Sequence, residues 1–335
     1  MTPRHGSTSN LISRAVWRSA LVMSLALSLL AVSMIPAASS PRGRAVPVRL
    51  AGEVRSTDAG EFGLFHPRAL TYLAGQDALL VMGFRHSEGL TGTVEITPAG
   101  RRMRDVRVPG AVGAVGLAFD PVARRLGVLT PRALSTISRN RAGFADARSK
   151  RLALAGVGVG RPLSIAYDQP GRSWYVLGTE GLIRVRARGP LGERMVRVGL
   201  PGMSDVRGVA SNPADGLLYL IDSRGTRLFA MDRSGRIRAV YMTDSVGLQR
   251  PRAITFAPSA DRTDGPGTLS LYVADRGAPG SAGRIVEVSL TVTTTASTVA
   301  AILVRTIDTS RLPYEIATDL VTAAAKAKSA APAAV

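Results

Sequence analysis

The chain has 335 residues, a hydrophobic content of 45% and a formal charge of +19 at neutral pH, which is enough for one large domain or two ordinary ones. It contains no cysteine, which excludes a disulfide framework, a thiolate nucleophile and any cysteine-ligated zinc or iron–sulfur site. Of the 43 basic residues only Lys150, Lys326 and Lys328 are lysines, so 40 are arginines. The charge therefore has two explanations: an anionic partner or surface, or the arginine bias of a GC-rich genome.

Residues 1–40 are expected to form a targeting segment that is not part of the fold. Arg4, Arg14 and Arg18 precede an apolar run from Ala20 to Ile35, and small residues suited to a signal peptidase follow. The run is shorter than the ~20 residues that span a bilayer. We expect a cleaved signal peptide, with a retained membrane anchor over residues 11–35 as the alternative. Both predict an exported protein that is secreted or held at the cell envelope.

A linker over residues 41–65 encloses one expected strand, Val46–Val54. Five repeats follow over residues 66–312, and each begins with a short apolar strand in which a small residue precedes a central aliphatic one. Copies recur every 44 to 48 residues, as shown by the aliphatic residues Leu70, Leu117, Ile165, Val209 and Ile254. The small residues, expected where innermost strands crowd together, are Ala69, Gly116, Ser164, Gly208 and Ala253.

Two further strands are expected in each repeat, separated by turn signals such as Asp120-Pro121 and Asn212-Pro213. The second strands are Ala78–Met82, Arg125–Leu129, Ser173–Leu177, Leu217–Ile221 and Leu269–Ala274. The third strands are Gly92–Ile96, Ala133–Ser138, Gly181–Val185, Arg227–Met231 and Arg284–Leu290. A period of 40 to 50 residues with four strands per repeat is typical of a β-propeller. The absence of amphipathic helices between the strands excludes a parallel α/β fold.

Parts of the fourth and fifth repeats resemble a known family. Residues 208–222, which read Gly-Val-Ala-Ser-Asn-Pro-Ala-Asp-Gly-Leu-Leu-Tyr-Leu-Ile-Asp, are similar to NHL-type repeats, as are residues 271–275 followed by 283–288. This resemblance implies a six-bladed propeller and specifies a fold rather than an activity.

The chain departs from the six-bladed pattern after the fifth repeat. A fourth strand of blade five is expected at Ala301–Thr309, and the tail at residues 313–335 is Ala-rich and of low complexity, with no room for a sixth blade. Either five blades close, with Val46–Val54 as an added outer strand, or the chain is a shortened product that has lost its last blade.

Catalytic groups are scarce in the repeats. His66 and His86 are the histidines outside the targeting segment, and the chain has no Gly-x-Ser-x-Gly nucleophile elbow. Metal-dependent propeller lactonases and phosphoesterases place oxygen ligands near the axis. The starts of the first strands instead carry Arg68, Val115, Leu163, Arg207 and Arg252. The acids Asp120, Asp168, Asp222 and Asp275 are interpreted as turn residues, and we expect no metal, no cofactor and no catalytic residue.

Arginines occupy several of the positions at the starts of the first strands where catalytic groups would be expected. Arg68, Arg207 and Arg252 share one repeat position, and Arg161 and Arg250 lie two residues before it. In a closed ring these residues should converge on one axial face, with His66 beside them. Guanidinium groups bind carboxylate and phosphate bidentately, so convergence predicts an anion-binding funnel. The alternative is that arginine is simply abundant.

The function predicted from the sequence is a non-catalytic binding module that recognises an anionic glycan, a lipid headgroup or a protein through this axial face. Nucleic acid is not expected, because few aromatic residues are interleaved with the arginine clusters. A membrane contact is expected only through an uncleaved N-terminus. The alternatives are a lactonase-like propeller hydrolase or lyase, and a membrane-tethered scaffold.

Overall fold

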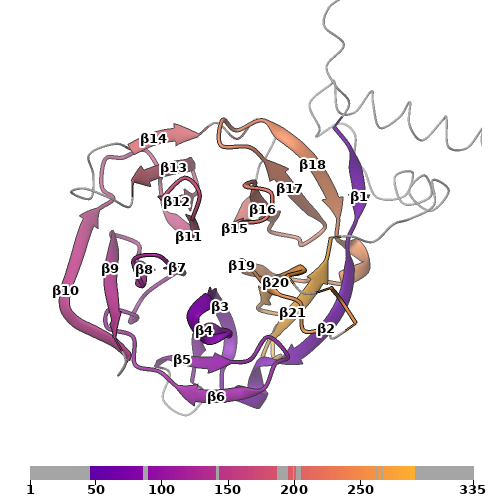
Figure 1. Ribbon diagram of the computed structural model, residues 1–335, viewed down its shortest axis with the longest axis horizontal. Helices are drawn as coiled ribbons and strands as arrows, with labels where there is room; N and C mark the ends of the chain where they lie inside the picture. Colours follow the sequence, from indigo (N-terminus) through magenta and orange to yellow (C-terminus); the bar gives the residue numbers. More distant parts are fainter. Residues whose placement is uncertain are drawn as a thin grey trace, which may run out of the picture. The chain divides into compact units, whose positions relative to one another are not determined.

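The computed structural model describes residues 46–85, 90–140, 143–186, 195–198, 200, 205–261, 263–265 and 267–290. These residues form five small β-sheets arranged in a ring, which confirms the expected all-β propeller (Figure 1). The expected targeting segment, the C-terminal tail, His86 and the expected strand at 301–309 lie outside the described residues. Within the described part, no helix has the length and hydropathy needed to cross a membrane.

Each blade is a sheet in which four strands follow one another outward from the axis. Blade one contains β3 (Phe65–Leu73), β4 (Ala78–Phe84), β5 (Thr91–Ile96) and β6 (Arg102–Asp105). Blade two contains β7 (Gly116–Asp120), β8 (Arg125–Leu129), β9 (Ala133–Asn140) and β10 (Gly143–Ala153). Blade three contains β11 (Pro162–Asp168), β12 (Ser173–Gly178), β13 (Gly181–Arg186) and β14 (Met195–Val198). The second and third strands of every blade agree with the expected ranges to within two residues.

Blades four and five complete the ring. Blade four contains β15 (Val206–Ser211), β16 (Leu218–Asp222), β17 (Arg227–Met231) and β18 (Ile237–Met242). Blade five contains β19 (Pro251–Pro258), β20 (Leu269–Asp275), β21 (Arg284–Ser289) and β2 (Gly52–Asp58). Short 3-10 turns are η1 (Ala59–Phe62), η2 (Ala74–Gln76) and η3 (Asp244–Val246).

The ring closes through the stretch that precedes the first blade. β2 pairs antiparallel with β21 and takes the outer position of blade five, for which the sequence had suggested residues 301–309. The expected single strand at 46–54 is in fact divided in two, because β1 (Val48–Leu50) pairs in parallel with β18 on the edge of blade four. Joining both ends of the described chain in one sheet leaves no open seam between blades five and one. Closure with five blades is therefore the alternative that the structure supports, and no sixth sheet occurs among the described residues.

Small residues occupy the narrow waist of the ring, as the repeat pattern predicts. A Cβ added to Gly116 would lie 3.0 Å from Ile165 Cγ2 on the next innermost strand. One added to Gly208 would lie 3.0 Å from Ile221 Cγ2 of its own blade and 3.4 Å from Ile254 Cγ1 on the next innermost strand. At the same level, Ser164 Oγ accepts a hydrogen bond of 3.3 Å from the backbone N–H of Val209 in the next blade. Neighbouring innermost strands thus approach too closely here for larger side chains.

The core consists of five apolar clusters, each between two adjacent blades. The central aliphatic residues fill the waist, and each is at most 3% exposed. They are Leu70, Leu117, Ile165, Val209 and Ile254. Each lies between the start of its innermost strand and the end of that strand. We refer to them as the aliphatic plug.

Two ion pairs also join neighbouring blades. Asp168 at the end of β11 is 1% exposed and accepts hydrogen bonds of 2.6 and 2.9 Å from Arg233 in blade four. Asp168 lies directly before the turn between β11 and β12, as expected, and the sequence does not predict its additional contact with the next blade. Glu95 of blade one is fully buried, and its Oε1 lies 2.7 Å from Arg139 Nη2 of blade two. Burial makes such pairs costly to break from one side only.

Candidate anion-binding face and axial cavity

A backbone irregularity directs the arginines at the start of the innermost strands. The register of β15 with β16 skips Arg207, and the register of β19 with β20 skips Arg252. Blade three skips Leu163 at the equivalent position, and the irregularity of blade one spans residues 66–68. A β-bulge leaves one residue out of the ladder and re-aims its side chain. The side chains left out of the ladder therefore do not follow the alternation between the two faces of the sheet that buries the rest of the strand.

Five arginines lie close enough together for their charges to interact. The pKa of Arg252 is lowered, first by burial and then by the positive charges of Arg207, Arg276, Arg250 and Arg68. The pKa of Arg68 is also lowered, by burial and by Arg276. Guanidinium groups stay protonated at physiological pH, so the lowered pKa means that the fold holds mutually repelling charges together. We call these five residues the arginine face.

Little negative charge compensates the arginine face. Arg207 Nη2 lies 2.9 Å from an exposed oxygen of Asp205, and this is the one ion pair of the face within the described part of the chain. The guanidinium of Arg68 lies 4.7 Å from the centre of the Phe84 ring. Arg250 Nε donates a 2.6 Å hydrogen bond to a backbone oxygen in the loop after β20. These contacts orient the side chains and leave most of the charge available.

Arg276 was not among the residues expected at this face. It directly follows β20, and because β20 runs antiparallel to β19, its end lies beside the start of β19. Its backbone N–H donates to the carbonyl of Arg250 at 3.0 Å. Arg276 Nε is buried and has no hydrogen-bond partner. The available signal in the sequence was a basic residue placed immediately after a second strand.

The other two residues expected at the face have different surroundings. His66 begins blade one with a left-handed backbone at φ 51°. Its backbone N–H donates to Ala282 at 2.6 Å, and its Nδ1 is buried without a hydrogen-bond partner. Arg161 is exposed at the start of blade three. It is not one of the charges that lower the pKa of Arg252. The structure thus brings Arg68, Arg207 and Arg250 within range of the charge of Arg252, and the position of Arg161 at the face stays a prediction.

The acids that end second strands hold turns, as expected. Asp222 accepts hydrogen bonds of 2.9 Å from both the backbone and the hydroxyl of Thr226. Asp275 is fully buried and accepts from the backbone N–H of Arg250 at 2.7 Å, so it positions one residue of the arginine face. Among the described residues, no group of three or more His, Cys, Asp or Glu side chains is placed to hold a metal ion.

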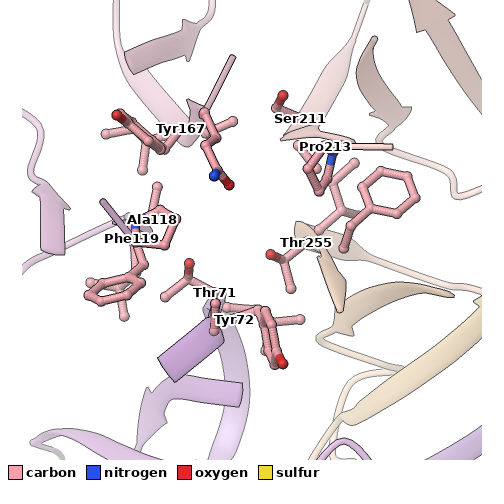
Figure 2. Close-up of a pocket in the computed structure, with 18 of the residues that line it drawn as sticks. Thr71, Tyr72, Ala118, Phe119, Tyr167, Ser211, Pro213 and Thr255 are labelled. Carbon is pink, nitrogen blue, oxygen red and sulfur yellow. The ribbon is translucent and has the colours of Figure 1, made fainter. Parts of the chain in front are cut away.

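A cavity of about 170 Å³ lies on the other side of the aliphatic plug, toward the ends of the innermost strands. Its wall takes equivalent residues from all five blades (Figure 2). The position after the plug supplies Thr71, Ala118, Ala166, Ala210 and Thr255, and the next position supplies Tyr72, Phe119, Tyr167, Ser211 and Phe256. Because the innermost strands all run in one direction along the axis, the arginine face and this cavity occupy opposite ends of the propeller.

Fold and site together define a five-bladed β-propeller with a positively charged axial face. No protein-family model matches the chain, and no curated protein matches it. Among solved structures, a glutaminyl cyclase from Myxococcus xanthus is similar with a TM-score of 0.52 and 17% identity, over 74% of this chain and 100% of that chain. At this identity the similarity shows the fold alone.

Two other solved structures are similar at a lower level. A streptogramin B lyase has a TM-score of 0.39 and 13% identity, over 68% of this chain and 94% of that chain. A calcium-binding protein, regucalcin, from Agrobacterium tumefaciens has a TM-score of 0.42 and 14% identity, over 73% of this chain and 96% of that chain. A propeller fold does not by itself specify an activity, so the function has to be argued from the site.

Proposed function

We propose that this protein is a non-catalytic binding module whose arginine face holds an oxyanion, a phosphate or carboxylate group, of its partner. The observation that carries the proposal is the position of Arg252, partly buried among four other arginines that all lower its pKa. Repulsion between the arginines does not stabilise the folded protein, whereas a bound anion would compensate their charges. Planar guanidinium groups also match phosphate and carboxylate oxygens in pairs.

The partner class follows from the same geometry. Phosphate groups and carboxylates occur on lipid headgroups, on acidic glycans and on acidic protein segments, and all three present the oxyanion that the face would bind. A face at one end of an axis is open to a large partner. We therefore propose recognition of a charged group at the surface of a macromolecule rather than turnover of a small substrate.

The decisive experiment is a binding titration by calorimetry at low salt. The probes are a heparin oligosaccharide, vesicles with phosphatidylglycerol and a Glu-rich peptide. The variant is Arg68→Gln with Arg207→Gln and Arg252→Gln. The matched control removes three exposed arginines elsewhere, as Arg101→Gln with Arg132→Gln and Arg236→Gln.

At least one probe should bind the unchanged protein, and the axial variant should lose at least tenfold in affinity while the control loses little. Added salt should weaken the binding, as expected for exposed charges. Equal losses in the two variants would mean that only the net charge of +19 matters, and the proposal would be wrong.

We also propose that the protein acts outside the cytoplasm or at the cell envelope. The support is the basic flank and the apolar run Ala20–Ile35 of the sequence. Sequencing the N-terminus of the mature protein tests this: a start near residue 40 indicates cleavage and secretion, an intact N-terminus in the membrane fraction indicates an anchor, and an intact N-terminus in the cytosol contradicts the proposal.

A further inference from the structure

The axial cavity differs in chemistry from the arginine face at the other end of the propeller. None of the residues in its wall is Asp, Glu, Lys, Arg or His. Tyr72 donates a hydrogen bond of 2.9 Å to Asp77, which lies outside the wall, and burial followed by this contact raises its pKa well above the usual range. Tyr72 is therefore neutral at physiological pH. A charged guest would give up its hydration here with no opposite charge in return.

Aromatic side chains form the outer part of the wall in four of the five blades. Figure 2 shows the hydroxyl groups of Tyr72 and Tyr167 directed away from the cavity, so their rings rather than their polar ends face it. The Tyr167 ring is also fixed from behind, with its centre 4.7 Å from that of Trp174. Blade four carries Ser211 where the other blades carry an aromatic residue. Four of the five blades thus contribute an aromatic residue to the wall, and the same residues also pack against the apolar clusters between blades.

Polar atoms make up nearly half of the exposed surface of this wall. The hydroxyls of Thr71 and Thr255 point toward the interior in Figure 2, and the amide of Gln169 belongs to the same wall. A hydroxyl can donate one hydrogen bond and accept two. These groups can therefore satisfy one neutral polar group of a guest.

The volume sets the size of the guest. About 170 Å³ is slightly more than the roughly 150 Å³ of an apolar cavity that accommodates benzene. We infer that the axial cavity is a second binding site, independent of the arginine face, for a small uncharged molecule with a flat apolar body of about one ring and one hydroxyl or amide group. The aliphatic plug lies between the two sites along each innermost strand, and the two sites have no residue in common.

Ligand-observed NMR on the whole protein tests this inference with four probes of one ring each: benzene, phenol, benzamide and benzoate. Phenol and benzamide should bind, and benzoate should bind at least tenfold more weakly because its charge has no counterpart in the wall. The nuclear Overhauser contacts of bound phenol should reach the methyl groups of Thr71 and Thr255.

Two isosteric changes separate hydrogen bonding from volume. Thr71→Val with Thr255→Val keeps the shape of the cavity and removes its inward hydroxyls, so benzamide should lose about tenfold while benzene is unaffected. Thr91→Val with Thr268→Val is the matched control, since neither residue belongs to the wall.

Several results would overturn the inference. Absence of binding for all four probes at millimolar concentration would show a cavity filled by water alone. Equal affinity for benzoate, or equal losses in the two double variants, would show binding elsewhere on the molecule. The arginine variants that test the proposed function should leave phenol binding unchanged, so failure of one proposal does not decide the other.

Discussion

Replacing Arg252 by methionine should stabilise the protein, although the change truncates a partly buried side chain. Methionine keeps most of the apolar stem of arginine and removes the charge that four other arginines repel. Folding lowers the pKa of Arg252, so the charged form is less favourable in the folded state than in the unfolded one, and deleting the charge should remove that penalty.

The magnitude follows from the neighbours. A single partly exposed charge pair contributes about 0.2–1 kcal/mol, and Asp205 already offsets one of the four neighbouring charges, that of Arg207. We expect Arg252→Met to raise the free energy of unfolding by about 1 kcal/mol. For a domain of this size that corresponds to a rise of about 2–4 °C in melting temperature.

The opposite result is expected where an arginine has a buried partner. Arg233 donates two hydrogen bonds to Asp168, which is 1% exposed, and these hydrogen bonds, against a smaller effect of burial, raise the pKa of Arg233. Arg233→Met leaves that carboxylate buried without compensation. The Arg233 side chain is 38% exposed, so we expect a loss below the ~3–5 kcal/mol of a fully buried pair, about 2–3 kcal/mol, or about 5–10 °C in melting temperature.

Differential scanning calorimetry at low and at 1 M NaCl measures both changes, with Arg132→Met as the control that removes one exposed charge. Salt should stabilise the unchanged protein more than Arg252→Met, because it screens the same repulsion that the substitution removes. A lower melting temperature for Arg252→Met than for Arg132→Met, in protein with native circular dichroism, would refute the argument that Arg252 is held under repulsion.

Three further changes test the fold. Gly127→Ala should destabilise by about 1–3 kcal/mol in thermal unfolding, because its Cβ would lie 2.7 Å from Trp174 Cζ3, whereas Gly75→Ala meets no atom within 4 Å and should be nearly neutral. Burial disfavours the charged form of Asp232, but hydrogen bonds from the turn that follows it outweigh this and lower its pKa to about 2. The Asp232 carboxylate thus stabilises the folded protein at pH values above its unfolded pKa near 4, and this contribution should be lost as the pH falls toward about 2. Asp232→Asn should therefore reduce the pH dependence of the free energy of unfolding in this range. Deleting residues 46–58 removes the strand that pairs with β21 and should give a protein that aggregates in light scattering, since an unpaired edge remains.

Much of the propeller could be predicted from the sequence because each blade repeats the same local constraints. The waist admits only small residues, as at Gly116 and Gly208, and the residue that follows must fill the space between blades. These requirements recur in every copy, so they remain visible as a period even where the sequence identity between copies is low. Strand ranges inside a blade were accurate for the same reason.

The ring closure was only partly predictable. Nothing in the local pattern of residues 46–54 says that one part pairs in parallel with blade four and the next part antiparallel with blade five. Such pairings join segments more than 190 residues apart, and sequence alone carries no signal for their register. Arg276 was missed for a related reason, since its place beside Arg250 depends on two strands meeting at one end.

Blade three shows why the arginine face calls for a functional explanation rather than a structural one. Its innermost strand has the same bulge as blades four and five, and the residue left out of the ladder there is Leu163. An aliphatic side chain is therefore compatible with this backbone position. Arg207 and Arg252 are not required to make the bulge, and Arg252 is held there against burial and like charge. The bulge itself therefore does not account for the repulsion around Arg252, and the anion-binding role that we propose would relieve it.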